Sequence, residues 1–280
     1  MKGKTVVATG ATSGIGEEAV LVLARLGARI VFVARDGKRA KATLDKLERA
    51  APRLGHSAHL ADLSSMAETR RIGRLIAESE PRIDVLVNNA GAMFADRRVM
   101  DEGLELTFAL NHMAYFVLTA ELVERLAASA PARVVSTSSI AHQGMRLDFS
   151  DLQSAKGYNG WRTYGRSKLA NILFTREAAR RLVGLGVTAN CLHPGFVASR
   201  FGSASGGWTS RLMPLARAFA ITPKQGADTL VHLASSSQVA SVTGAYFVKR
   251  KAVQPSAAAR DDAAAKALWM ASESLAGPGP

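Results

Sequence analysis

Short runs of β-branched and other apolar residues alternate along this chain with longer segments of helical period. The clearest strand-like runs are residues 5–9, 30–34, 83–87, 133–137, 187–192 and 245–248. Strands that are almost wholly apolar are typical of a sheet covered on both faces. Because strand–helix–strand connections are right-handed, the alternation predicts a doubly wound parallel α/β sheet with helices on both faces.

The helices can be placed by the spacing of their apolar residues. From Ile15 to Leu26 these residues recur at helical intervals, and Gly27 follows as a natural end. Further helices are predicted over residues 164–182, roughly 104–126, and 266–275 in the Ala-rich tail. Since no segment of the 280 residues has the composition of a linker, we expect one domain over 1–250 and a C-terminal tail with a short helix over 251–280.

The net charge of +13 requires a nucleic-acid or membrane-surface function to be considered. The Lys and Arg residues are scattered and have no interleaved aromatic residues, which favours a solvated surface and no nucleic-acid partner. Attraction of an anionic substrate or a phosphate-bearing cofactor is the other interpretation. A nucleic-acid-binding protein would show binding that falls steeply with salt.

Cysteine use and apolar run length indicate the compartment. The single cysteine, Cys191, excludes an internal disulfide framework, and the first strand begins at Thr5 with no room for a leader before it. These features predict a cytoplasmic protein. The longest apolar runs are strand-sized and fall short of the ~20 residues that a transmembrane helix requires, so we expect no transmembrane segment.

A glycine-rich turn, TGATSGIG from Thr9 to Gly16, separates the first strand from its helix. Its backbone N–H groups and the positive end of the helix suit a pyrophosphate. Gly10 permits the turn, Gly14 allows close approach to the phosphates, and Gly16 allows the helix to pack on the strand. Alone, such a turn is also compatible with an ordinary strand-to-helix connection.

The residue after the second strand indicates which dinucleotide is bound. A carboxylate there would bind the ribose 2′-hydroxyl of NAD, whereas an arginine would accept the 2′-phosphate of NADP. This chain has Arg35 after Ala34, and Asp36 comes one residue too late. We therefore expect NADP(H), with Lys38 and Arg39 reinforcing the same pocket. The alternative is that Arg35 is only a surface arginine.

Tyr164 and Lys168 are four residues apart on a predicted helix, which places both side chains on one face. A phenol of pKa ~10 is a poor base at neutral pH, but a nearby ammonium and an oxidised nicotinamide stabilise the phenolate. The pair therefore predicts a proton donor and acceptor at Tyr164. Without supporting motifs it would be read as a solvated face. Tyr158 is followed four residues later by Arg162 and is interpreted as a loop residue.

Together these features resemble the short-chain dehydrogenase/reductase family. The resemblance is carried by the G-x-x-x-G-x-G turn, Asn88-Asn89-Ala90-Gly91 after the strand at 83–87, the Tyr164 and Lys168 pair, and Pro194-Gly195 after the strand at 187–192. It extends from about Lys4 to Val248. It implies a single NADP-binding domain of the Rossmann type.

The resemblance also implies a catalytic tetrad of Asn111, Ser139, Tyr164 and Lys168. Ser139 would hold the substrate oxygen by a hydrogen bond, with Ser138 as the alternative if the register is off by one. Asn111 would anchor a water that connects Lys168 to solvent.

The cofactor contacts implied by the family extend over seven parts of the chain. They are Gly10, Thr12, Ser13, Gly14, Ile15 and Gly16 in the turn, Arg35, then Asp62 and Leu63 at the adenine, Asn89, Ala90 and Gly91, then Tyr164 and Lys168, Pro194 and Gly195, and Val197 and Ser199 near the carboxamide. The family more often has Thr where Ser199 stands. Asp62 is also compatible with a helix N-cap role.

Within the family, residues 133–142, the insert that contains Asp151-Leu152-Gln153, residues 167–171 and Ala267-Leu268-Trp269 most resemble retinol dehydrogenases. That branch acts on lipophilic alcohols, aldehydes and ketones, which predicts an oxidoreductase for such a substrate. An apolar lid is expected at about 199–222, although its residues could instead be core or an oligomer contact. The family implies a homodimer or homotetramer built on the helices at 104–126 and 164–182. The alternative function is an NADP(H)-binding sensor or scaffold without turnover.

Overall fold

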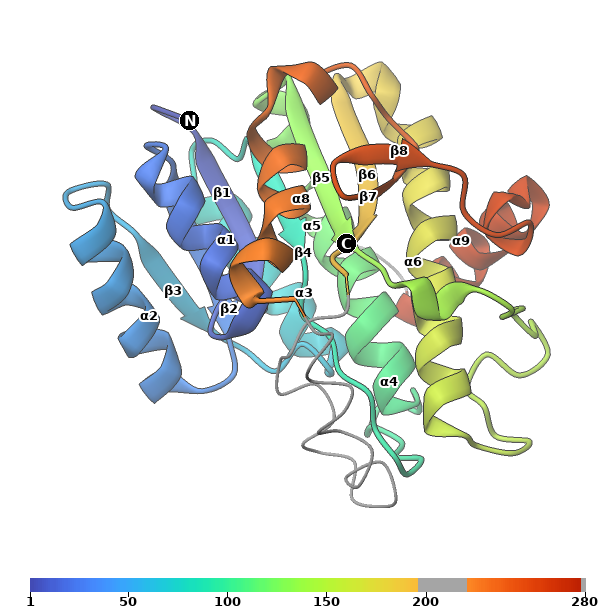
Figure 1. Cartoon of the computed structure of the whole chain (residues 1–280). Helices are drawn as coiled ribbons and strands as arrows, with labels where there is room; N and C mark the ends of the chain where they lie inside the picture. The colour runs from blue at the N-terminus through green and yellow to red at the C-terminus, as the bar shows by residue number, and fades with distance from the viewer. Residues whose placement is uncertain (196–220, 278–280) are drawn as a thin grey trace.

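The computed structural model describes residues 1–195 and 221–277. Eight strands form one sheet in the order β3-β2-β1-β4-β5-β6-β7-β8, parallel throughout except that β8 runs antiparallel to β7 (Figure 1). The strands are β1 Thr5–Thr9, β2 Arg29–Ala34, β3 Ser57–Leu60, β4 Val85–Asn88, β5 Ala132–Thr137, β6 Val187–His193, β7 Tyr246–Val248 and β8 Lys251–Val253. The predicted doubly wound α/β fold is confirmed.

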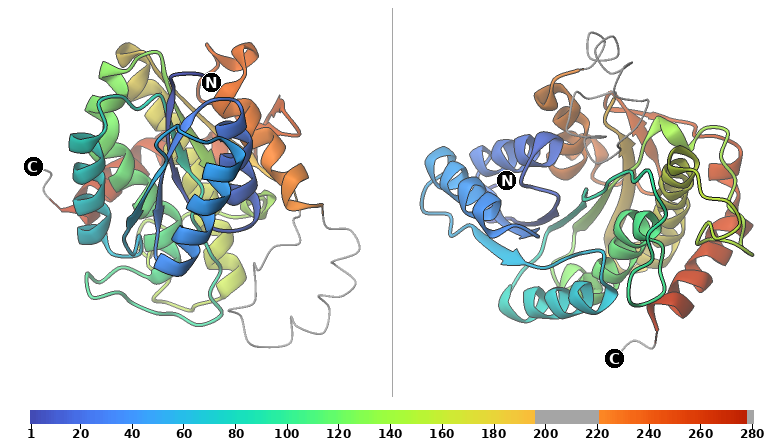
Figure 2. Two further views of the ribbon diagram at one scale, coloured as in Figure 1. Left: turned by 90° about the vertical axis from the view of Figure 1, so that its left-hand side faces the viewer. Right: turned by 90° about the horizontal axis from the view of Figure 1, so that it is seen from below.

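Helices cover both faces of this sheet (Figure 2). One face carries α1 Gly14–Arg25, α2 Gly37–Ala50 and α8 Pro223–Ser235, and the other carries α3 Met66–Ser79, α5 Ala114–Ala128, α6 Gly160–Leu182 and α9 Asp262–Ala276. Short 3₁₀ turns are η2 Ile140–His142, η3 Val183–Leu185, η4 Ser237–Val239 and η5 Ala258–Arg260. Along β1, Val6 and Ala8 pack into one core, and Val7 packs into the other. Alternate side chains of a strand point to opposite faces, so a sheet covered twice requires apolar residues at every position.

Two edge strands, β3 and β8, were not among the predicted runs. The three residues of β8 are exposed and those of β3 are half-buried or exposed. A strand at the rim has little core to cover, and its sequence therefore lacks the continuous apolar run of the central strands. The helix predicted to begin at Tyr164 begins at Gly160, where the side chain of Asn159 accepts a hydrogen bond from Arg162 N (3.0 Å).

The helix predicted over 104–126 spans Leu106–Ala128 and changes pitch within it. It comprises α4 Leu106–Phe108, a π-helical stretch η1 Ala109–Met113, and α5. By length and composition, this is the one helix among the described residues that is apolar enough to cross a membrane. From the sequence, only strand-sized apolar runs had been expected. Most of it is buried inside the protein, as in the core helix of a globular fold.

The C-terminal helix α9 lies on α6 and joins the same core (Figure 1). Ala265 and Leu268 are buried in it. The Trp269 ring stacks on Phe174 with centroids 5.8 Å apart, and the Arg181 guanidinium lies 4.6 Å from the centre of the indole. Part of α6, one of the two helices on which a homo-oligomer was expected to be built, is therefore covered by α9 of the same chain.

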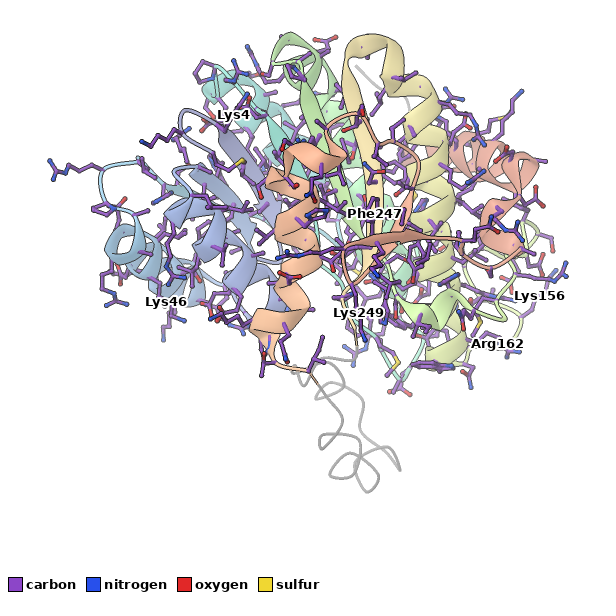
Figure 3. All side chains as sticks on the ribbon, turned by 45° about the horizontal axis from the view of Figure 1, so that its top comes forward. Lys4, Lys46, Lys156, Arg162, Phe247 and Lys249 are labelled. Carbon is purple, nitrogen blue, oxygen red and sulfur yellow. The ribbon has the colours of Figure 1, made fainter. Side chains whose placement is uncertain are left out.

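Basic side chains come from many separate elements. Lys4, Lys46, Lys156 and Lys249, labelled in Figure 3, lie before β1, on α2, in the loop before α6 and between β7 and β8. Several arginines are neutralised locally, as in the pairs that α3 forms with Glu121 of α5. The scattering read from the sequence is thus also present in space.

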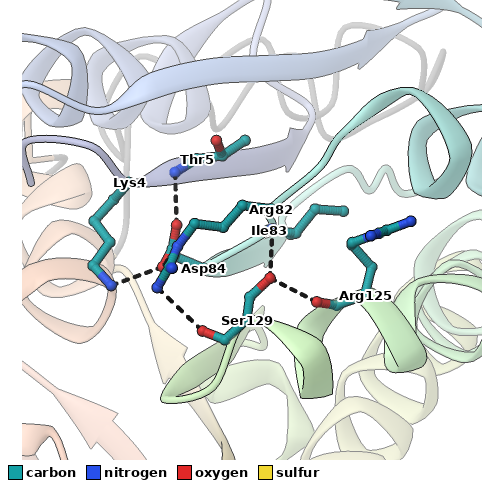
Figure 4. A network of polar contacts seen from close by, with 7 residues as sticks. All are labelled: Lys4, Thr5, Arg82, Ile83, Asp84, Arg125 and Ser129. Carbon is teal, nitrogen blue, oxygen red and sulfur yellow. Dashed lines mark hydrogen bonds and ion pairs between the residues drawn. The ribbon is translucent and has the colours of Figure 1, made fainter.

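The buried Asp84 carboxylate joins the amino ends of β1 and β4 (Figure 4). It accepts hydrogen bonds from Thr5 N (2.9 Å), Lys4 Nζ (2.8 Å) and Arg82 Nε (2.6 Å). Next to it, the Ser129 hydroxyl accepts from Ile83 N (3.0 Å). The network lies at the amino ends of the strands, on the opposite end of the sheet from their carboxyl ends. It therefore contributes to stability and not to a site at the carboxyl ends.

Replacing Asp84 by alanine should lower the free energy of unfolding by about 1–3 kcal/mol, because the buried Thr5 amide and two cations lose their acceptor. In a thermal melt the midpoint should fall by several degrees while kcat per folded molecule stays at the wild-type value. Asp45→Ala, which removes only the exposed pair with Lys41, is the matched control and should melt like the wild type. An Asp84→Ala midpoint equal to that of the control would contradict this role.

Candidate active site

The glycine turn packs so closely that side chains are excluded at two of its positions. Gly10 has a φ of +67°, and a Cβ there would lie 2.9 Å from the backbone of Ala90. A Cβ on Gly16 would lie 2.1 Å from the carbonyl oxygen of Gly10. These contacts draw the first turn of α1 against the end of β1, so that its first N–H groups stand at the carboxyl edge of the sheet.

The start of α1 also differs from the starts of α2, α3, α6, α8 and α9. Its N-cap residue Ser13 has extended backbone but makes no side-chain capping bond. The N-termini of α2, α3, α6, α8 and α9 are capped by Asp36, Ser65, Asn159, Thr222 and Asp261. The N–H groups of α1 are therefore not used by a side-chain cap, and the donors and the helix dipole suit the pyrophosphate of a dinucleotide. The residues present fit that group.

Two threonines hold the segment after β4 against the glycine turn. Thr9 Oγ1 accepts hydrogen bonds from the backbone N–H groups of Asn89 (2.9 Å) and Ala90 (3.1 Å). The Asn89 side chain reaches Gly10 O (3.3 Å) and accepts from Thr137 Oγ1 (3.0 Å). Asn89 thus links the carboxyl ends of β1, β4 and β5, and neither Thr9 nor Thr137 had been singled out from the sequence.

The carboxylate of Asp36 is hydrogen bonded to backbone N–H groups. It caps α2 by accepting from Lys38 N (2.9 Å) and Arg39 N (3.0 Å), and these hydrogen bonds lower the pKa of Asp36. The side chain of Arg35 is exposed at the end of β2. An arginine, and not a free carboxylate, therefore stands where the second ribose of a dinucleotide is expected.

Asp62 does not cap α3. Its Oδ1 accepts from Ser64 N (3.0 Å) and Ser64 Oγ (2.7 Å), while Ser65 is the N-cap of α3. The side chain of Leu63 is buried in the core. A contact of Leu63 with the adenine stays a prediction.

Tyr164 and Lys168 lie on the inward face of α6 and both are buried. Lys168 Nζ is 5.6 Å from the centre of the Tyr164 ring and 5.8 Å from that of the Tyr115 ring. The ammonium nitrogen donates to Thr137 O (3.2 Å), at the end of β5. The spacing had predicted these two side chains on one face, and they do point toward a common space.

Burial governs the electrostatics of this pair. It raises the pKa of Tyr164, against which a hydrogen bond with Ser139 acts to lower it. Burial also lowers the pKa of Lys168 from 10.5 to about 7. The proximity of Lys168 is therefore not sufficient to make Tyr164 more acidic, because loss of hydration has the largest effect on the pKa of both groups. The phenol is protonated at neutral pH.

The two adjacent serines after β5 have different partners. The buried Ser138 hydroxyl donates to the carbonyl oxygen of Lys168 (2.7 Å), within α6. Ser139 Oγ accepts from Ala141 N (3.2 Å) and is hydrogen bonded to Tyr164. Of the two candidates, Ser139 is the one that faces the phenol.

Asn111 lies in the π-helical stretch, a feature that occurs frequently at functional sites. Its Oδ1 accepts from Ala92 N (2.8 Å), and its Nδ2 donates to Ala92 O (2.9 Å) and Ser167 Oγ (2.9 Å). One amide proton thus holds the segment after β4, and the other is used by Ser167 of α6. A water beside Lys168 could be held only by the second lone pair of Oδ1 or by the main-chain carbonyl.

Three glycines that were not assigned these contacts bring the parts of the site together. A Cβ on Gly91 would lie 3.2 Å from Lys168 Nζ, and one on Gly165 would lie 2.6 Å from Ala141 O. A Cβ on Gly160 would lie 2.3 Å from Phe94 O. Glycine inside a helix costs about 1 kcal/mol relative to alanine, so Gly165, inside the predicted helix, was a readable signal of close packing.

The segment after β6 is described only in part. Gly195, which follows Pro194, has a φ of +96° and packs against Ile221. Val197 and Ser199 lie outside the described residues, as does the expected lid except for its last two residues. Tyr158 is in a loop, as predicted, and its hydroxyl donates to Phe94 O (2.9 Å).

Of the two other reactive side chains on β6, Cys191 is buried and His193 is half-buried. Burial raises the pKa of the Cys191 thiol to about 12 and lowers the pKa of His193 to about 4. Over residues 1–195 and 221–277, no three His, Cys, Asp or Glu side chains form a group that could hold a metal ion.

Sequence comparison relates this arrangement to known proteins. The short chain dehydrogenase family matches residues 4–208. Retinol dehydrogenase 13 of Homo sapiens is 38% identical over 98% of this chain and 85% of its own length. Retinol dehydrogenase 14 of Homo sapiens is 40% identical over 99% of this chain and 87% of its own length.

Solved structures are similar over the whole fold. An uncharacterized protein from Mycobacterium paratuberculosis has a TM-score of 0.79 and 31% identity, covering 98% of this chain and 94% of its own. The RhlG/NADP active-site complex of Pseudomonas aeruginosa has a TM-score of 0.69 and 29% identity, covering 88% and 94%.

Proposed function

Because this chain belongs to the short-chain dehydrogenase/reductase family and is an NAD(P)-dependent oxidoreductase of alcohol and carbonyl groups, we propose that Tyr164 is its general acid and base. The observation that carries the proposal is the cluster of Ser139 with the buried Tyr164 and Lys168 at the carboxyl ends of the strands, the end of the sheet at which α1 also starts without a side-chain cap. The bound nicotinamide would supply or accept the hydride.

In reduction, the Tyr164 hydroxyl gives its proton to the carbonyl oxygen, so that no free alkoxide forms. The Ser139 hydroxyl, which accepts from Ala141 N and is hydrogen bonded to Tyr164, would donate its proton to the same oxygen when a substrate is bound. Lys168 lies behind the phenol and restores the proton. A lysine whose pKa is about 7 exchanges a proton readily near neutral pH, which suits this role. Oxidation of an alcohol runs through the same groups in reverse.

We propose NADP(H) as the preferred cofactor. The exposed Arg35 offers a planar pair of donors for a 2′-phosphate, and Asp36 is held by the first turn of α2. An RhlG structure with NADP is among the similar proteins. The proposed phosphate and nicotinamide contacts are those given above, Val197 and Ser199 included.

Replacing Arg35 by alanine should raise the KM for NADPH about 10- to 100-fold, because a charge-assisted pair of hydrogen bonds to the phosphate is lost. The KM for NADH should change little, since NADH has no 2′-phosphate. Steady-state kinetics with both cofactors give the comparison, and Arg49→Ala at the far end of α2 is the matched control. An unchanged KM for NADPH would rule out this role for Arg35.

We propose that the substrate is a lipophilic alcohol, aldehyde or ketone. The relatives of this chain include retinol dehydrogenases. Apolar side chains are also exposed around the proposed site. Trp161, whose ring centre is 6.2 Å from that of Tyr164, is 57% exposed, and Ile140 next to Ser139 is 52% exposed. Partly solvated apolar groups next to a reacting centre favour an apolar ligand.

The test is NADPH consumption across a carbonyl panel that includes retinal, long-chain aldehydes and small polar ketones. Turnover should be fastest with the lipophilic members. Cofactor binding without turnover on any member would instead support the sensor or scaffold alternative. The cytoplasmic location, the homo-oligomer, and the division into residues 1–250 with a lid at 199–222 and a tail at 251–280 stay predictions.

A further inference from the structure

His142 is a fully buried histidine at the end of η2, three residues after Ser139. Its Nδ1 lies 2.7 Å from the carbonyl oxygen of Ser139, and its Nε2 lies 3.2 Å from Ser256 N. The ring packs edge-on against Tyr246 of β7, with centroids 5.2 Å apart. One imidazole therefore connects the loop after β5 to the segment after β8.

The two partners determine the tautomer. A backbone N–H can only donate, so Nε2 must accept from Ser256 with its lone pair. Nδ1 then carries the ring proton and donates to Ser139 O, because a carbonyl can only accept. The ring is neutral in this arrangement, and burial also lowers the pKa of His142.

These contacts orient Ser139. Its carbonyl oxygen accepts from both His142 Nδ1 and His142 N (3.2 Å), while its Oγ accepts from Ala141 N (3.2 Å). The same hydroxyl is hydrogen bonded to Tyr164. Because both its carbonyl oxygen and its Oγ are held, Ser139 has one direction in which to present its hydroxyl proton.

We propose that His142 is a positioning residue, whose Nδ1–H fixes the Ser139 carbonyl and thereby holds the Ser139 hydroxyl on Tyr164, with Ser256 N as the anchor of the ring. This inference rests on the proposed function of Ser139. A displacement of about 1 Å at a reacting group can lower the rate about 100-fold, so such a device has a measurable effect on turnover.

Three substitutions separate the two contacts. His142→Leu removes both, His142→Gln places an amide near the position of Nε2, and His142→Asn places a donor near the position of Nδ1. We expect His142→Leu and His142→Gln to lower kcat about 10- to 100-fold with little change in the KM for NADPH. His142→Asn should rescue most of this loss. His232→Leu on α8 is the matched control and should keep the wild-type kcat.

A second measurement guards against a general loss of structure. In a Ser139→Ala background, adding His142→Leu should lower kcat less than about twofold, because the group on which His142 acts is already absent. A further 10- to 100-fold loss in that background, or equal losses for the Asn and Leu variants, would overturn the proposal. Wild-type kcat in His142→Leu would overturn it as well. Wild-type kcat in Ser139→Ala would instead overturn the proposed function.

Discussion

Replacing Tyr164 by phenylalanine is expected to lower kcat about 10²- to 10⁴-fold, the usual contribution of a positioned general acid. Phenylalanine keeps the buried ring and its packing beside Lys168, so that only the hydroxyl and its hydrogen bond with Ser139 are lost. Titration of cofactor binding and a thermal melt should both match the wild type. The result would then isolate proton transfer from binding and folding.

Tyr158→Phe is the matched control for this experiment. Tyr158 lies in the loop before α6 and donates to Phe94 O, away from Lys168. Its variant should keep most of the wild-type kcat. If Tyr164→Phe turned over substrate at the wild-type rate, another residue would have to supply the proton, and the assignment of Tyr164 would fail.

Replacing Lys168 by methionine should act on activity and stability in opposite directions. Activity should fall at least about 100-fold, because the proton relay behind Tyr164 is lost. Stability should rise at neutral pH, because a buried amine that resists protonation is exchanged for an apolar chain of similar length. Few substitutions in a core are expected to stabilise it, which makes the second effect a distinctive test.

The sign of the pH dependence follows from the pKa of Lys168, which burial lowers from 10.5 to about 7. Between these values the unfolded chain binds a proton that the folded chain does not, so retaining Lys168 destabilises the fold increasingly as pH falls toward 7. The cost is greatest below about pH 7 and disappears above pH 10.5. The gain in Lys168→Met should therefore be larger at pH 7 than at pH 9, by at most about 3 kcal/mol.

Urea unfolding of both proteins at pH 7 and pH 9 gives this difference. Lys156→Met removes an exposed lysine from the loop before α6 and should change neither stability nor activity. An equal effect of Lys168→Met at pH 7 and pH 9 would instead show that Lys168 is held as a cation in the folded protein, because both states would then carry the same proton.

Local pattern was sufficient for most of the fold. The strand at 5–9 and the helix ending before Gly27 lie within a residue or two of where they were predicted. A central strand with both faces buried requires an unbroken apolar run, and such a run is visible without knowing its neighbours. The edge strands β3 and β8 have no such requirement, and their sequences carry no comparable signal.

The site could be predicted to the extent that its residues are neighbours along the chain. Four residues make one helical turn, so Tyr164 and Lys168 had to share a face of α6. The hydrogen bonds of Ser139 to Tyr164 and of Asn111 to Ala92 and Ser167 cross between separate elements. Spacing says nothing about which of two adjacent serines will face such a partner.

The sequence by itself determined the parallel sheet, the glycine turn and the pairing of the tyrosine with the lysine, since each follows from the period of a strand or a helix. Only the tertiary structure decided how α9 covers α6, how His142 joins Ser139 to Ser256, and that Tyr164 and Lys168 are buried deeply enough for loss of hydration to dominate their pKa values. Those properties depend on how completely segments far apart in the chain exclude water from one another, and that exclusion is a result of packing.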